Sequence, residues 1–215
     1  MILEKAKRSQ RGRPISFDKA QLVDSVMHKF WELGYNKVSL NEIAKDHGLT
    51  RASLYHSFDS KEALFLQALQ LYLQRAPDVL LEHSREPEQV GSLLFALFDS
   101  ICKARAEDPQ RRGCLVLNCM HELITTDSPL ADHMQAILTR RQGQMKALVE
   151  RAQRNGEINP GVDAELTGNM VINFLFGLNT FSKTCTDEQQ LLALCEAFLN
   201  SLGFHRQTEL NQRAM

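Results

Sequence analysis

The residues whose types and spacing could do the most specific chemistry lie between Ser39 and Lys61. Four side chains with hydrogen-bonding or stacking groups follow one another closely there: Arg51, Ser53, Tyr55 and His56. A guanidinium, hydroxyls and an imidazole presented together suit the base edges and phosphates of duplex DNA. The pattern therefore predicts a DNA-reading surface, provided that one short helix turns these groups outward.

A pair of short helices with a tight turn between them would hold such a surface. The first helix has apolar or small residues on one side, and these are Leu40, Ile43 and Ala44. The turn needs a residue that tolerates a positive φ, and Gly48 does so at little steric cost. On the second helix Leu54 and Phe58 are four residues apart, so both can point into a core.

Capping residues mark the ends of these helices. Ser39 with Glu42 three residues later has the pattern of a capping box. The hydroxyl of Thr50 can cap the second helix, and either Asp59 or Ser60 can cap the helix that follows. The boundaries predicted from the caps agree with those predicted from the apolar positions.

Lys61 occupies the first turn of that following helix. A cation at this position opposes the helix dipole and gains nothing locally. A nearby DNA phosphate would explain it, and a solvated surface lysine is an equally good interpretation from the sequence alone.

The stretch 39–64 resembles the signature of the tetracycline-repressor (TetR) family, which runs through a helix-turn-helix into a long fourth helix. The matching residues are Ser39-Leu40-Asn41-Glu42-Ile43-Ala44 and Gly48-Leu49-Thr50-Arg51-Ala52-Ser53-Leu54-Tyr55-His56-Ser57-Phe58-Asp59-Ser60-Lys61-Glu62-Ala63-Leu64. Upstream, Gly12-Arg13-Pro14, Phe17-Asp18, Phe30-Trp31 and Gly34-Tyr35 resemble one common branch of the family. Ser39, His47 and Ala52 depart from the usual threonine, alanine and glycine, which affects the base contacts rather than the fold.

This resemblance implies an all-α fold with an N-terminal three-helix helix-turn-helix domain and a C-terminal helical domain for ligand binding and dimerisation. It implies a sequence-specific transcriptional regulator, a repressor that a small-molecule effector releases from a palindromic operator. The partners would be double-stranded DNA, a second copy of the chain and an unknown effector. The residues expected at the DNA are Arg13, Ser39, Thr50, Arg51, Ser53, Tyr55, His56 and Lys61.

Charge is divided unevenly along the chain. Residues 1–72 hold 11 Lys and Arg against 8 Asp and Glu, whereas residues 73–215 hold 14 against 18. We place the domain boundary within the helix predicted from residue 61, near Tyr72. The chain then divides into a basic arm (1–16), a helix-turn-helix domain (17–72), an effector-binding and dimerisation domain (73–206) and a tail (207–215). The arm can lie along phosphates or enter a minor groove, and a disordered solubilising tail is the alternative.

Cysteine usage and hydropathy indicate the compartment. Five cysteines without a CxxC pair, together with the lack of a secretory signal, predict the reducing cytoplasm. No run of about 18 apolar residues is present that could span a membrane.

The rest of the sequence has the pattern of helices throughout. Apolar periodicity and the positions of glycine and proline predict helices at about 61–76, 90–106, 113–123, 130–155, 163–183 and 187–202. The helix over 163–183 is apolar on all sides and must be covered all round. A second subunit would cover it at Met170, Phe174, Gly177 and Phe181, and a central position within one chain is the alternative.

Candidate effector-binding residues form two groups. Cys114, Asn118 and His121 recur at i, i+4 and i+7 and would share one helix face. Asn173 and Phe174, together with Asn179, offer an alternative lining for a pocket. The first group could also meet a metal ion, but packing and ordinary hydrogen bonding are the preferred interpretation of these side chains, and we predict no metal and no cofactor.

Cys114 is also a candidate sensor of oxidants or electrophiles. It follows Gly113 at the amino end of a predicted helix, with Arg111 and Arg112 just before it. A positive environment of this kind favours the reactive thiolate. The ordinary interpretation of such a cysteine is a small buried hydrophobe.

An enzyme and a protein-binding adaptor are the alternative classes. The chain has no GxGxxG, Walker, GxSxG or HExxH motif, and its 7 histidines are scattered. We therefore predict that the protein is not an enzyme. Sequence-specific binding to duplex DNA would separate a regulator from both alternatives, and turnover would identify an enzyme.

Overall fold

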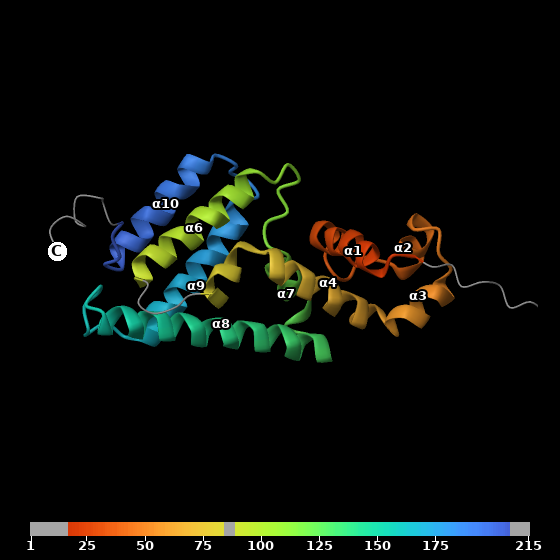
Figure 1. The fold of residues 1–215 in the computed structure, drawn as a ribbon, viewed down its shortest axis with the longest axis horizontal. Coiled ribbons are helices and arrows are strands. Elements are labelled where there is room, and N and C mark those ends of the chain that lie inside the picture. Colours follow the sequence, from red (N-terminus) through yellow and green to blue (C-terminus); the bar gives the residue numbers. More distant parts are fainter. Residues whose placement is uncertain (1–16, 84–88, 207–215) are drawn as a thin grey trace, which may run out of the picture.

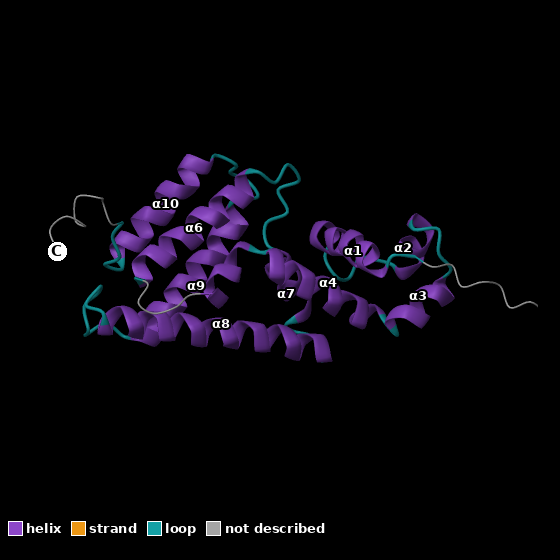
Figure 2. Cartoon of the chain, viewed as in Figure 1, coloured by secondary structure: helices purple, strands orange, loops and turns teal. Residues whose placement is uncertain are grey.

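The computed structural model describes residues 17–83 and 89–206, and these residues form helices joined by turns and loops (Figure 2). The helices are α1 (Lys19–Leu33), α2 (Leu40–Asp46), α3 (Arg51–Phe58), α4 (Lys61–Arg75), the 3-10 turn η1 (Pro77–Val79), α5 (Leu80–His83), α6 (Val90–Ala106), α7 (Leu115–Leu123), α8 (Pro129–Arg154), α9 (Ala164–Phe181) and α10 (Glu188–Ser201). The all-α prediction is confirmed. The arm 1–16, which includes Arg13, and the tail 207–215 lie outside the described residues.

The helices are distributed along the long axis of the molecule (Figure 1). α1, α2 and α3 lie at one end, and α6, α9 and α10 lie at the other, with α4 leading from the first group toward the second. α7 lies between the groups and packs against α1, α4 and α8. A helix so placed touches both the end that carries the predicted reading surface and the end that carries the larger bundle.

The turn between α2 and α3 forms as the sequence predicts. Gly48 has a φ of 63°, in the left-handed region where glycine is least strained. Thr50 Oγ1 accepts a hydrogen bond from the amide of Ser53 at 3.1 Å and so caps α3. The α4 helix is capped by Ser60, whose hydroxyl accepts from the amide of Ala63 at 3.0 Å.

The predicted capping box on α2 was wrong, because neither of its two hydrogen bonds between Ser39 and Glu42 is present. The Ser39 hydroxyl does cap the helix, and it accepts from the amide of Asn41 at 3.3 Å. Glu42 is exposed and makes no hydrogen bond back to Ser39. Solvation of the carboxylate at the surface competes with that return bond, so a single hydroxyl caps the helix.

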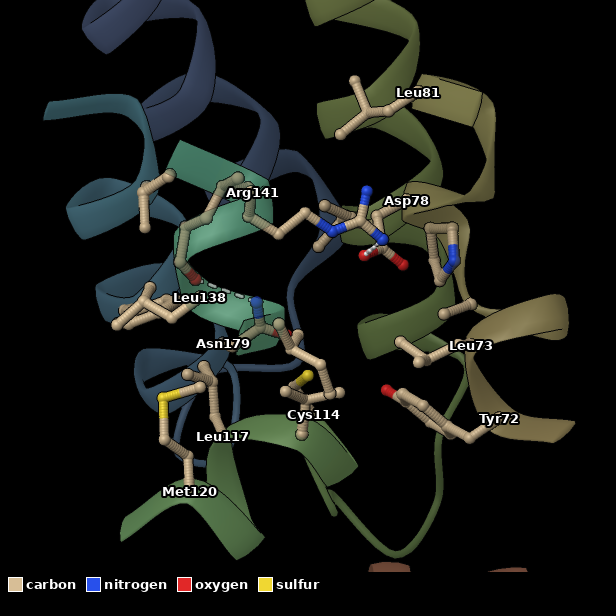
Figure 3. Close-up of a pocket in the computed structure, with 18 of the residues that line it drawn as sticks. Tyr72, Leu73, Asp78, Leu81, Cys114, Leu117, Met120, Leu138, Arg141 and Asn179 are labelled. Atoms are coloured by element: carbon tan, nitrogen blue, oxygen red, sulfur yellow. Dashed lines mark hydrogen bonds and ion pairs between the residues drawn. The ribbon is translucent and has the colours of Figure 1, made fainter. Parts of the chain in front are cut away.

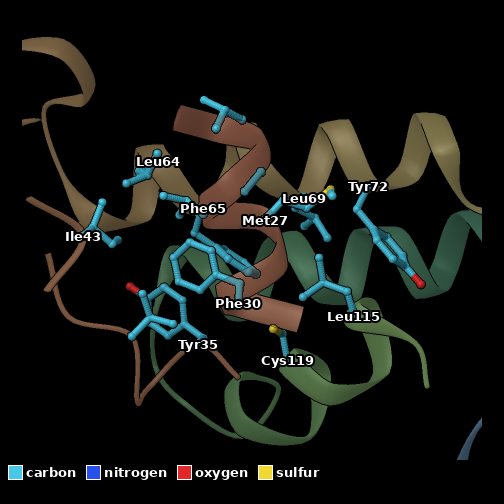
Figure 4. Close-up of a cluster of buried hydrophobic side chains, with 14 of the residues drawn as sticks. Met27, Phe30, Tyr35, Ile43, Leu64, Phe65, Leu69, Tyr72, Leu115 and Cys119 are labelled. Atoms are coloured by element: carbon cyan, nitrogen blue, oxygen red, sulfur yellow. The ribbon is translucent and has the colours of Figure 1, made fainter. Parts of the chain in front are cut away.

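The core around α1 and α4 contains aromatic rings that pack edge to face (Figure 4). Phe65 lies edge-on to both Phe30 and Tyr35, with ring centroids 5.0 Å apart in each pair. Leu115 and Cys119 of α7 are buried in the same cluster. Full burial of a leucine or phenylalanine stabilises a fold by roughly 1.5–3 kcal/mol, so removing α7 would cost the N-terminal helices a substantial part of their core.

The second core joins α6, α8, α9 and α10. Phe174 stacks on Phe198 with ring centroids 4.0 Å apart, and both contact Phe98. α9 packs so closely on α8 that a Cβ built on Gly168 would lie 2.9 Å from the backbone nitrogen of Lys146 and 3.1 Å from the carbonyl carbon of Met145. Gly168 therefore allows close packing of α9 on α8 within one chain.

One side of α9 stays uncovered in the single chain. Val171, Ile172 and Leu178 are buried, whereas Leu166, Met170 and Phe181 are 61%, 43% and 40% exposed. The alternative of a helix buried wholly within one chain is thus excluded. A line of large apolar side chains faces outward instead.

We predict opposite stability changes for alanine at two helical glycines. Gly168→Ala should lower the free energy of unfolding by about 1–3 kcal/mol, because backbone atoms of α8 must move to admit the methyl group. Gly143→Ala on α8, where the added methyl meets nothing within 4 Å, should raise it by about 0.5–1 kcal/mol through helix propensity. Denaturant unfolding at one protein concentration measures both, and equal changes would contradict the close α8–α9 packing.

Candidate functional site

The exposed side of α3 carries the residues predicted to read DNA. Arg51, Tyr55 and His56 are exposed, and Leu54 and Phe58 are buried on the opposite side as predicted. Arg51 Nη2 donates to the Tyr55 hydroxyl at 3.2 Å, and its guanidinium lies 5.3 Å from the Tyr55 ring centroid. This contact holds the two side chains together on the exposed side of α3.

The hydroxyl groups expected at the DNA also stabilise the ends of α2 and α3. Ser39 and Thr50 cap α2 and α3, and the Ser53 hydroxyl shares a 2.8 Å hydrogen bond with Thr50 Oγ1. Ser39 and Ser53 are half-buried, whereas Thr50 is exposed. The helix ends and the candidate contact groups are therefore parts of one arrangement.

Lys61 is half-buried against the protein surface. Its ammonium lies 4.3 Å from the centroid of the Tyr35 ring and 3.4 Å from the carbonyl oxygen of Asn36. Burial lowers its pKa, although the charges of Glu62 and Glu122 oppose that shift. Neither of the two interpretations drawn from the sequence included this contact between α4 and the loop that precedes α2.

An apolar cavity lies between the N-terminal helices and the bundle (Figure 3). Its empty volume is about 770 Å³, part of it open to solvent, and residues of α4, η1, α5, α6, α7, α8 and α9 line it. Most of the lining is aliphatic, for example Leu73, Leu117 and Leu138. A mostly apolar hollow with a few polar groups on its wall is typical of a small-molecule site.

Polar groups gather at two places on the cavity wall. Arg105, Tyr72 and Asn179 form the first group: Arg105 Nε donates to Asn179 Oδ1 at 2.7 Å, and Nη2 donates to the Tyr72 hydroxyl at 3.4 Å. Arg105 is only 4% exposed. At the second place Arg141 pairs with Asp78 at 2.6 Å, as Figure 3 shows.

A set of hydrogen bonds, which we name the α7 joint, ties the cavity wall to the N-terminal helices. Trp31 Nε1 of α1 donates to the carbonyl of Gly113 at 2.9 Å, just before α7. Asn118 of α7 donates to the carbonyl of Trp31 at 3.3 Å. Glu122, one turn further, accepts from the backbone amide of Asn36 at 2.7 Å. α7 therefore meets the cavity at its amino end and the loop before α2 at its carboxyl end.

A charge pair covers the α7 joint on one side. The Arg112 guanidinium lies 3.9 Å from the centroid of the Trp31 ring and pairs with Asp108 at 3.0 Å. Burial would raise the pKa of Asp108, but its hydrogen bonds from Arg112 outweigh burial and hold that pKa below the ordinary value. The pair stays ionised, and the Arg112 guanidinium covers one face of the Trp31 indole.

The described residues hold no group of three His, Cys, Asp or Glu side chains that could bind a metal ion. Within the same residues, no helix is long and apolar enough to cross a membrane.

Two domain families match the chain. Residues 22–68 match "Bacterial regulatory proteins, tetR family", and residues 92–202, which are more than half of the chain, match "Tetracyclin repressor-like, C-terminal domain". The chain belongs to the TetR family. The resemblance seen in the sequence is thereby confirmed.

Relatives of this TetR-family chain include two bacterial regulators. The "Uncharacterized HTH-type transcriptional regulator YezE" of Bacillus subtilis (strain 168) is 27% identical over 156 residues, 73% of this chain and 80% of the relative. The "HTH-type transcriptional repressor ComR" of Escherichia coli (strain K12) is 24% identical over 188 residues, 87% of this chain and 90% of the relative.

A solved structure of another family member shares the fold. It is a cysteine mutant of the TetR family transcriptional regulator CifR, complexed with 26-bp double-strand operator DNA. It is 28% identical to this chain with a TM-score of 0.69, and the match covers 89% of this chain and 100% of CifR.

The structure brings two of the sequence-predicted effector candidates, Cys114 and Asn179, to the cavity. The prediction that Cys114, Asn118 and His121 share a helix face was wrong, because Gly113 turns the chain with a φ of 69° and α7 begins only at Leu115. Asn118 points to α1 instead, and His121 is exposed.

Of the alternative candidates on α9, Asn173 and Phe174 do not line the cavity, whereas Asn179 does. Asn173 is exposed and donates to the carbonyl of Asn169 in its own helix, and Phe174 packs on Phe198. Arg105 was missed, although it continues the buried α6 positions Leu94, Phe98 and Ile101 at helical spacing. A charged residue in such an apolar row was the signal that could have found it.

The five cysteines differ in their access to reagents. Cys102, Cys119 and Cys195 are buried, and Cys114 and Cys185 are half-buried. Burial raises the pKa of the Cys119 thiol to about 12. The Cys185 thiol donates to Gln190 Oε1 at 3.0 Å, while Cys114 opens into the cavity.

Cys114 should therefore react with N-ethylmaleimide at neutral pH faster than the other four cysteines. Quenching at timed intervals and mass spectrometry of the peptides would give the five rates. Cys114→Ser is the control for assignment and for the response of DNA binding to thiol reagents. Equal rates, or a Cys114→Ser variant that responds to electrophiles as the natural chain does, would reduce Cys114 to a packing residue.

Proposed function

We propose that this protein is a ligand-responsive repressor that binds a palindromic operator as a homodimer and leaves it when a small molecule fills the cavity. The observation that carries the proposal is the α7 joint, because it links the cavity wall by direct hydrogen bonds to α1 and to the loop before α2. α2 in turn packs against α3. A ligand cavity that is connected through α7 to the helices of the reading domain is what a ligand-controlled DNA-binding protein requires.

The DNA-binding part of the proposal rests on the exposed face of α3 and on the family. TetR-family members bind operator DNA, and the CifR complex is an example. In this chain α3 would enter the major groove with Arg51, Tyr55 and His56, while Ser39, Thr50, Ser53 and Lys61 position it on the backbone. Arg13 and the rest of the basic arm would add contacts to phosphates or to the minor groove.

The dimer rests on the uncovered side of α9. Leu166, Met170 and Phe181 are exposed there, and Leu194 of α10 is 42% exposed. Gly177 lies on the same exposed side, with nothing within 4 Å of a Cβ built on it. TetR-family proteins act as dimers, and a twofold dimer would read two half-sites.

Control by a ligand needs only a difference in affinity between two arrangements of the joint. A molecule in the cavity would press on Cys114 and the start of α7, and the joint would pass that displacement to Trp31 and Asn36. The spacing of the two reading surfaces in a dimer then changes, and operator affinity falls.

We further propose that residues 17–72 act as the reading domain and residues 73–206 as the effector and dimerisation domain. The family consists of regulators, and we propose that the chain catalyses no reaction. Its place would be the cytoplasm, where bacterial operator DNA is found.

The DNA contact predicts distinct effects for Arg51 and Lys61. Arg51→Ala should cost about 1–3 kcal/mol of operator binding and relax the preference at one position per half-site. Lys61→Ala should weaken binding to all sequences and reduce the slope of log K against log salt by ~0.9 for a lost phosphate contact. Binding to fragments selected from genomic DNA, measured over a salt series, tests both.

Two controls make those DNA-binding results interpretable. Arg140→Ala removes an exposed arginine of α8 that pairs with Glu82 and should leave operator binding unchanged. Unfolding of Lys61→Ala must be measured too, because its ammonium also contacts Tyr35 and Asn36. Natural affinity and preference in the Arg51 variant would remove Arg51 from the reading surface.

The dimer predicts that Gly177 tolerates no large side chain. The natural chain should sediment at micromolar concentration as about two chains per particle, and Gly177→Leu should shift it toward one. Gly143→Leu is the matched control, since both positions are helical and open in the single chain. A natural chain that sediments as a monomer would contradict both the interface and the palindromic operator.

A further inference from the structure

Arg105 is a buried cation without a counter-ion. Its side chain is 96% buried by the 4% exposure of the residue, and no carboxylate among the described residues lies within 4.0 Å of its guanidinium. Arginine remains charged at every physiological pH. A buried charge without a partner is costly, and folded proteins ordinarily pair it.

The groups that do contact Arg105 are neutral. Asn179 Oδ1 accepts from Nε, and the amide nitrogen of Asn179 is already used by the carbonyl of Leu175 at 2.8 Å. The Tyr72 hydroxyl accepts from Nη2 at 3.4 Å, and burial raises the pKa of Tyr72, so it stays protonated. Within the described part of the chain, Nη1 has no hydrogen-bond acceptor.

The other arginines nearby are compensated. Arg112 pairs with Asp108, and Arg141 pairs with Asp78 on the far part of the cavity wall. The cavity therefore has one end whose positive charge is balanced and one end, at Arg105, whose charge is not. Between them the wall is aliphatic and aromatic.

We propose that the ligand of this cavity is an organic carboxylate with an apolar body, bound with its carboxylate against Arg105 and the Tyr72 hydroxyl. A carboxylate can accept two parallel N–H bonds from one guanidinium, which is the strongest neutralisation available to it. The apolar body would occupy the space beside Leu73, Leu117 and Leu138. This inference rests on the proposed function of the cavity as the effector site.

The first test compares matched ligands on the natural dimer. Isothermal titration with sodium octanoate and sodium 4-phenylbutyrate is set against 1-octanol and 4-phenylbutan-1-ol, which keep the apolar body and lose the charge. Each carboxylate should bind about tenfold or more tightly than its alcohol, as expected for a charge-assisted pair in a desolvated site. Equal affinity, or tighter binding of the alcohols, would overturn the proposal.

The second test introduces a carboxylate of the protein itself beside Arg105. Asn179→Asp places a carboxylate beside Arg105 Nε, so octanoate binding should fall about tenfold while thermal stability rises. Arg105→Met should remove the preference for the carboxylate and leave 1-octanol binding as it is. Arg140→Met, at an exposed position outside the cavity, is the control and should change neither. Unchanged octanoate binding in Asn179→Asp would overturn the proposal even if Arg105→Met did not fold.

Operator release separates this inference from the function on which it rests. If octanoate binds with the stated preference but operator affinity does not change, the ligand class stands and the repressor mechanism fails. If the alcohols bind more tightly and release the operator, the mechanism stands and the ligand class is wrong.

Discussion

The hydrogen bond from Trp31 Nε1 to the carbonyl of Gly113 is the constraint on which the rest of the structure depends. It fixes the chain just before α7, and a Cβ at Gly113 would lie 3.0 Å from the carbonyl of Asn179 on α9. α1, α7 and α9 thus meet at one glycine with a φ of 69°. Because Cys114 follows Gly113 directly and lines the cavity, a displacement of the chain at Cys114 would change this contact.

The joint and the cavity differ in how their arginines are compensated. Arg112 has Asp108 and stacks on Trp31, so the joint is a neutralised, rigid contact. Arg105, also within 6.0 Å of the Trp31 ring centroid, has only neutral acceptors. A ligand anion at Arg105 would change the electrostatics beside the same indole, which places the ligand's charge at the start of the path to the reading surface.

The N-terminal helices could be predicted from the sequence, whereas the cavity could not. Local signals such as Gly48 and the Thr50 cap specify the helix-turn-helix, and both were confirmed in the structure. Helical spacing also predicted the bounds of α6 to α10 within a few residues. It assigned Cys114 and His121 to one helix face, because residue spacing does not reveal the turn at Gly113. The pairing of Arg105 with Tyr72 joins residues 33 positions apart, and no periodicity within one helix encodes such a contact.

The coupling through Trp31 can be measured without knowing the effector, because a maleimide attached to Cys114 occupies the cavity at a known place. Operator affinity is compared before and after this modification in the natural chain and in Trp31→Phe, which keeps an aromatic ring and loses the indole donor. Cys114→Ser corrects for modification of other cysteines. We expect a loss of about tenfold or more in the natural chain and a clearly smaller loss in Trp31→Phe. The same loss in both would contradict the α7 joint as the link between cavity and DNA.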